Sequence, residues 1–180
     1  MVWHVQLVSY ILSLFTVLGE LGAIFLLLAL LSRRFNWRVA FFDRPLALLA
    51  PHGVTFAFIV AASGVVSSLY YSEIAGFVPC TLCWWQRIFF YPQAIILGMA
   101  LLGKARDVAR ICITLSALGG VFAIYHNYLQ YGGVPFIPCS AFGASCVQRY
   151  FLEFGYVTIP AMAFTAFALI ILMLLMKKGE

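Results

Sequence analysis

Five apolar runs, each about as long as a lipid bilayer is thick, take up most of this 180-residue chain. They lie at roughly 5–32, 46–70, 84–103, 108–130 and 156–176. A transmembrane helix needs about 20 apolar residues, and only closed hydrogen-bonded structures such as helices can cross the lipid. We therefore predict an all-α membrane protein with five spans.

The composition excludes a soluble fold. Hydrophobic residues make up 64% of the chain and charged residues 9%, whereas a soluble domain is about half apolar and about a quarter charged. There are too few polar side chains to cover a water-facing surface, and membrane lipid is the expected surrounding. The net charge of +5 is interpreted as a signal of topology, so no nucleic-acid partner is expected.

The basic residues alternate between the connections. Nine of the 11 lysines and arginines fall between runs one and two, between runs three and four, or after run five: Arg33, Arg34, Arg38, Arg44, Lys104, Arg106, Arg110, Lys177 and Lys178. Cytoplasmic loops are enriched in such residues. This pattern predicts that the N-terminus is outside, that the C-terminus is cytoplasmic, and that the loops near 71–83 and 131–155 are extracytoplasmic.

Four of the five cysteines fall in these two outer loops. Cys80 and Cys83 lie in the first loop, Cys139 and Cys146 lie in the second, and Cys112 lies near the cytoplasmic end of the fourth run. Outside the cytoplasm, thiols are normally paired as disulfides. We interpret Cys112 as a small buried packing residue without a redox role.

Three kinds of site fit the outer cysteines. They could form two structural disulfides in a non-enzymatic membrane scaffold, or a zinc site with four convergent ligands. The second pair has six intervening residues and lacks the usual zinc-knuckle spacing, so no metal is predicted. The third kind is a redox relay, because a CxxC pair can form and break its disulfide with little backbone movement.

The third run places a cation beside the CxxC pair. Cys83 is predicted to precede the helix directly, where unpaired N–H groups favour the thiolate. Arg87 follows four residues later, on the same face and about 6 Å along the axis. A charged residue at this depth is costly and is a functional hypothesis by default, although it could instead snorkel to the interface.

His126 in the fourth run is predicted to lie at a similar depth to Arg87, so the two side chains could meet beside Cys83. Two donors near a thiolate suit the reduction of a quinone, because one can stabilise a developing oxygen anion and the other can deliver a proton. The alternative is that His126 only forms an interhelical hydrogen bond.

Two further features concern packing. Small residues in the runs permit close helix approach: Gly64, Gly98, Gly119 and Gly120. Glu20, within the first run, must be protonated, paired or turned to a polar cavity, and His52 is a possible partner for it.

The motif PCTLCWWQR resembles the disulfide bond formation protein B (DsbB) family. The matching features are Cys80, Cys83 and Arg87 in a CxxC-x3-R arrangement, His126 thirteen residues before Cys139, and the second cysteine pair. The resemblance covers roughly residues 44–176 and is to the short-loop form. It divides the chain into an extra N-terminal helix with a basic loop (1–43) and a four-helix quinone-linked redox domain (44–180).

The resemblance implies a protein-disulfide:quinone oxidoreductase in the bacterial cytoplasmic membrane. The partner would be a DsbA-like thioredoxin-fold protein, reoxidised on the extracytoplasmic side through Cys139–Cys146, which supports disulfide formation in exported proteins. Electrons would then pass to Cys80–Cys83 and on to ubiquinone or menaquinone, with Arg87 and His126 beside the quinone. A related reductase running in the opposite direction stays possible, because direction depends on the redox potentials.

Overall fold

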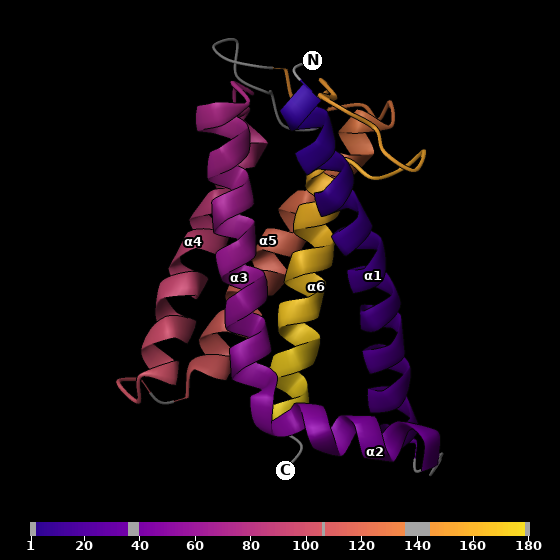
Figure 1. Cartoon of the computed structure of the whole chain (residues 1–180), viewed down its shortest axis with the longest axis vertical. Coiled ribbons are helices and arrows are strands. Elements are labelled where there is room, and N and C mark those ends of the chain that lie inside the picture. Colours follow the sequence, from indigo (N-terminus) through magenta and orange to yellow (C-terminus); the bar gives the residue numbers. More distant parts are fainter. Residues whose placement is uncertain (1–2, 36–39, 106, 136–144, 179–180) are drawn as a thin grey trace.

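The computed structural model describes residues 3–35, 40–105, 107–135 and 145–178, and these residues form six α-helices (Figure 1). The helices are α1 (Trp3–Arg34), α2 (Ala40–Leu49), α3 (Gly53–Leu69), α4 (Thr81–Leu101), α5 (Val108–Gln130) and α6 (Ile159–Lys178). A 3-10 turn, Ala50–His52, joins α2 to α3, and a π-helical turn, Tyr70–Ile74, extends α3. The predicted all-α fold is confirmed.

Helices α3, α4, α5 and α6 form a four-helix bundle. Around this bundle α3 packs on α4, α4 on α5, α5 on α6 and α6 on α3, while α1 packs on the outer side of α6. The start of α4 and the end of α5 lie at the same end of the molecule as the N-terminus, and α2 and the C-terminus lie at the opposite end (Figure 1).

Two of the four glycines that were expected to permit close helix approach make room for aromatic side chains in the bundle. A Cβ atom at Gly64 would lie 2.3 Å from the ring of Phe90, and one at Gly119 would lie 2.3 Å from the ring of Phe167. The two phenylalanines meet edge to face in the core, with their ring centroids 4.8 Å apart. Alanine at either glycine would therefore force the core to move.

The five predicted spans are supported unequally. Within the described residues, 4 helical segments are long and apolar enough to cross a membrane: Trp3–Arg34, Arg44–Ile74, Val108–Gln130 and Ile159–Met176. Helix α4 is also long, with 21 residues, but polar side chains such as Gln93 lower its hydropathy. Gln93 is fully buried and its Oε1 accepts a hydrogen bond of 2.8 Å from Ser116, so the bundle compensates for this polarity.

The second run does not begin as one straight helix at residue 46. Instead, α2 crosses the end of the bundle, and the upright helix α3 begins at Gly53 (Figure 1). Pro51 lies in the 3-10 turn between them. Because proline has no N–H to donate and its ring clashes with the preceding turn, a change of direction here is expected.

Glu20 is paired, as one of the expected alternatives had it, but its partner is not His52. The Glu20 carboxylate accepts hydrogen bonds from Tyr156, at 2.5 Å, and from Thr165 of α6, at 3.2 Å. His52 lies at the α2 end of the molecule, where its ring contacts Phe56. The face of α1 that carries Glu20 packs on α6, and this helix supplies one of the two partners.

Candidate active site

Cys80 caps the N-terminus of α4. Its backbone is extended (φ −79°, ψ 173°), and its sulfur accepts a hydrogen bond of 3.4 Å from the N–H of Cys83. The helix therefore begins earlier than predicted, and Cys83 lies in its first turn rather than before it. Both sulfurs lie at the positive end of the helix dipole, where a thiolate is favoured.

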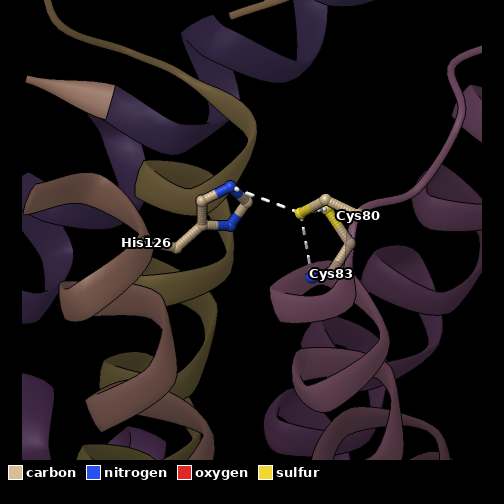
Figure 2. Close-up of side chains that lie close together, drawn as sticks. All are labelled: Cys80, Cys83 and His126. Atoms are coloured by element: carbon tan, nitrogen blue, oxygen red, sulfur yellow. Dashed lines mark hydrogen bonds between the residues drawn. The ribbon is translucent and has the colours of Figure 1, made fainter. Parts of the chain in front are cut away.

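The two sulfurs and His126 form one compact cluster (Figure 2). The Sγ atoms of Cys80 and Cys83 are 3.1 Å apart, and both thiols are free. Nε2 of His126, from α5, lies 3.7 Å from Sγ of Cys80. Because Cys80 is 4% exposed and His126 is 2% exposed, water scarcely competes for these contacts.

Gln86 hydrogen-bonds to the imidazole on the side away from Cys80 and sets the tautomer of the neutral ring. Its side-chain Nε2 lies 3.1 Å from Nδ1 of His126, and Gln86 is buried. The amide nitrogen can only donate, so Nδ1 accepts, and the proton of a neutral imidazole must be on Nε2. His126 therefore points an N–H at the sulfur of Cys80.

These contacts stabilise a thiolate on Cys80. The hydrogen bond from Cys83 lowers the pKa of Cys80 most, His126 lowers it further, and burial opposes both, so the pKa falls to about 4. A free cysteine has a pKa of about 8.5. In the reduced protein the negative charge of the pair therefore lies on Cys80 at neutral pH.

The thiolate absorbance of the reduced protein should persist as the pH is lowered towards 4. The pKa of Cys80 is lower in the folded protein than in the unfolded chain. The contribution of the Cys80 thiolate to the stability of the fold is therefore fully present above about pH 8.5 and is lost as the pH falls through about 4. In His126→Ala, which lacks one of the donors, the titration should move to higher pH. An unchanged titration in this variant, with Cys80→Ser as the control that removes the signal, would contradict the assignment.

Arg87, on α4, contacts α3 and not α5, the helix that carries His126. Its Nε and one terminal nitrogen donate to the Oγ and the backbone oxygen of Ser68 in α3, both at 2.9 Å. Its guanidinium also lies over the ring of Trp84, 5.1 Å from the centroid. The expected meeting of Arg87 with His126 beside Cys83 is therefore not seen, because the two side chains face different neighbours.

A cavity of about 530 Å³ opens beside Cys83. It lies between α1, α3, α4 and α6, and its walls are mainly apolar. Cys83, Gln86 and Arg87 line it together, whereas His126 is not among its lining residues. The cavity thus joins a thiol and a guanidinium at one place in an otherwise apolar space.

The second outer cysteine pair is only partly within the described structure. Cys146 is disulfide-bonded and is 1% exposed, in a cluster with Cys80, Leu82 and Leu129. The structure therefore brings Cys146 close to the CxxC pair. Cys139 lies outside the described residues.

Cys80, Cys83 and His126 could also hold a metal ion, because their ligand atoms all lie within 4.8 Å of one another. Two sulfurs and an imidazole are three of the four ligands that a tetrahedral zinc site requires. The same closeness is what a dithiol needs to form a disulfide, so the geometry fits both kinds of chemistry.

Sequence reasoning missed Gln86, Ser68 and Tyr150. Gln86 had a detectable signal, since a glutamine inside a span is costly unless it is paired. Ser68 and Tyr150 had none. Tyr150 lies beside the cavity, where its hydroxyl donates to the backbone oxygen of Val78 at 2.8 Å, and burial together with the nearby Cys83 raises its pKa.

Thiols 3.1 Å apart can close into a disulfide with little movement, and Cys146 beside them already belongs to one. The fold and the site thus define a class, the multi-pass membrane thiol–disulfide oxidoreductases. Within it, the sequence model of one family, "Disulfide bond formation protein DsbB", matches residues 51–177. The chain belongs to this DsbB family, as its CxxC-x3-R motif predicted, and its role is in disulfide bond formation.

Curated relatives agree with this assignment. Disulfide bond formation protein C of Bacillus subtilis is 38% identical over 128 residues, which are 69% of this chain and 91% of the relative. A probable disulfide formation protein of Deinococcus radiodurans is 40% identical over 127 residues, which are 66% and 83% of the two chains. No solved structure matches the chain.

Proposed function

We propose that this protein oxidises the dithiol of a DsbA-like thioredoxin-fold partner and passes the two electrons to a membrane quinone. The observation that carries the proposal is the position of Cys83. It contacts Cys80 at one side and, together with Arg87, lines the apolar cavity at the other. A dithiol that opens onto such a space can exchange electrons with a hydrophobic acceptor.

The cavity fits a quinone in size and character. Ligand cavities are typically about 300–1,000 Å³ and mostly apolar, with a few placed polar groups. Here the volume is about 530 Å³, and the Ser68 contacts hold Arg87 in a fixed orientation. A bound quinone, ubiquinone or menaquinone, would supply an acceptor of two electrons and two protons.

The first step takes place at the second cysteine pair. A thiolate of the reduced partner attacks the Cys139–Cys146 disulfide, with Cys139 as the attacked sulfur, and forms a mixed disulfide. The partner's second thiol then displaces Cys139. The partner leaves with a disulfide, and Cys139 and Cys146 each keep a thiol, so two electrons have entered the protein.

The second step moves these electrons to Cys80 and Cys83. Exchange between the two pairs re-forms the Cys139–Cys146 disulfide and leaves the CxxC pair as a dithiol. The packing of Cys146 beside Cys80 supports a direct exchange. His126 and the N–H of Cys83 hold the charge on Cys80 in this state.

In the last step the Cys80 thiolate and the Cys83 thiol lose two electrons as their disulfide forms, and Cys83 releases one proton. These two electrons, this proton and one further proton from water would pass to a bound quinone. Cys83 gives up its electrons at the cavity, where the Arg87 guanidinium stabilises negative charge. His126, whose Nε2 lies 3.7 Å from Sγ of Cys80 on the other side of the pair, stabilises the Cys80 thiolate before the disulfide forms and does not line the cavity.

The positions of the basic residues support an extracytoplasmic site in a bacterial cytoplasmic membrane. Arg33, Arg34 and Arg110 lie on α1 and α5 at the end opposite to Cys80. Positive loops stay in the cytoplasm. The cysteine cluster would then face the compartment in which disulfides form.

Trapping of the partner tests this order of events. We expect Cys146→Ala to accumulate a mixed disulfide with the reduced partner through Cys139. A membrane-impermeant thiol reagent applied to intact cells should prevent this trapping, because it would block Cys139 from outside. The matched control is Cys112→Ala, which should turn over without trapping. Complete inertness towards the partner would favour a structural scaffold, and trapping through Cys80 alone would reject the assigned order.

A further inference from the structure

The N-terminal helix α1 lies outside the region that matches the DsbB family, which begins at residue 51. It nevertheless forms part of the cavity wall, to which it contributes Leu12, Phe15 and Thr16. A helix that only anchored the chain in the membrane would not need to line this cavity. This position gives α1 a direct influence on what the cavity can hold.

The polar face of α1 is turned towards the protein. Ser9 and Ser13 are 0% exposed and Thr16 is 8% exposed, and Glu20 follows at the same helical spacing. Leu14, Leu18 and Leu21, on the opposite face, are 45%, 54% and 61% exposed. Since apolar side chains face lipid and polar ones face the bundle, α1 is oriented by contacts with the other helices.

Hydrogen bonds fix α1 both above and below Thr16. Towards the N-terminal end, the hydroxyl of Tyr71 lies 3.3 Å from the Oγ of Ser9. Further along the helix, Glu20 accepts from Tyr156 and Thr165. Tyr71 and Thr165 themselves line the cavity, so the contacts that hold α1 in place are part of the same wall.

The two rims of the cavity face the lipid. Phe15 of α1 is 65% exposed and Ile59 of α3 is 54% exposed, and both line the cavity. Both helices pack on α6 and flank it in Figure 1. The polar end of the cavity holds Cys83 and Arg87, and its apolar part extends between α1 and α3.

We propose that α1 is the wall that recognises the isoprenoid tail of the quinone, so that Leu12, Phe15 and Thr16 determine which quinones bind tightly. The inference rests on the proposed function, because it assumes that the quinone ring lies beside Cys83 and Arg87. With the ring there, the tail leaves the cavity between α1 and α3. A quinone without a tail makes no contact with α1.

The test compares two ligands, a benzoquinone with no tail and one with a long alkyl tail. Their dissociation constants are measured on the purified full-length protein by quenching of its tryptophan fluorescence. Thr16→Phe, which fills the cavity, should weaken binding of the tailed quinone about tenfold or more and leave the tail-free one within about twofold. The matched control, Leu14→Phe on the lipid-facing side, should change neither.

Leu12→Ala gives an independent readout should Thr16→Phe fail to fold. By removing apolar contact it should weaken the tailed quinone about 3- to 10-fold and spare the tail-free one. Equal loss for both quinones, or no loss for either, would overturn the role of α1 while leaving the redox function intact. If the wild-type protein binds neither quinone, the proposed function itself fails.

Discussion

Replacing Arg87 with alanine should slow quinone reduction by about 100- to 1000-fold, which is the usual cost of losing a preorganised donor. Arg87 lines the cavity together with Cys83 and is held by Ser68. Thiol exchange with the partner should stay within about twofold of wild type, because it takes place at the second cysteine pair. Lysine should restore only part of the rate, since it supplies charge without the planar fork.

The measurement is quinone reduction at varied quinone concentration, with partner exchange followed separately in each variant. Arg149→Ala is the matched control, because Arg149 is an exposed arginine at the same end of the molecule that contacts Tyr131 instead of the cavity. If exchange and quinone reduction fell together in Arg87→Ala, Arg87 would be a structural link between α4 and α3.

Cys83→Ser should reduce quinone-dependent turnover to background, because no disulfide can form at the cavity without this sulfur. Cys80→Ser should do the same, since it removes the thiolate that His126 and Cys83 stabilise. Both effects are expected to exceed that of Arg87→Ala, because they remove an electron carrier rather than a stabilising charge.

Cys112→Ala provides the contrast. Cys112 is 0% exposed in the bundle core and lies fourteen residues before His126 on α5, about 20 Å along the axis at 1.5 Å per residue. Turnover should stay within about twofold of wild type, with only the small loss of stability that a buried Cys-to-Ala change brings. Loss of turnover in a folded Cys112→Ala protein would show that the relay includes a third site.

Spacing and depth were enough to predict the helical bundle and to place His126 at the level of the CxxC pair. The CxxC motif directly precedes the third apolar run, so its two sulfurs were expected at the start of a helix. The hydropathy runs fix how deep each residue lies, so His126 was expected near the start of α4, and it contacts Cys80 there.

Rotation of a helix about its own axis could not be predicted in the same way. Gln86 and Arg87 are neighbours in sequence, but successive residues point about 100° apart on a helix. As a result Gln86 faces His126 of α5, while Arg87 faces Ser68 of α3. Depth alone suggested that Arg87 and His126 would meet.

The role of α1 depended on packing between distant segments. Glu20 pairs with Tyr156 and Thr165, more than a hundred residues along the chain. Nothing in the run around Glu20 indicates which helix its face will contact. The position of Thr16 in the cavity wall depends on the packing of α1 against α6, so it could not be predicted from the sequence either.

Electron transfer from the CxxC pair to quinone is tested most directly by a single turnover without oxygen. The purified protein is fully reduced, freed of reductant, and mixed with quinone, and the quinol formed is compared with the Cys80–Cys83 disulfide formed, as mapped by mass spectrometry. We expect one quinol for each Cys80–Cys83 disulfide in a protein whose other cysteines have been replaced. Quinone that stays oxidised while both thiols remain reduced would contradict it.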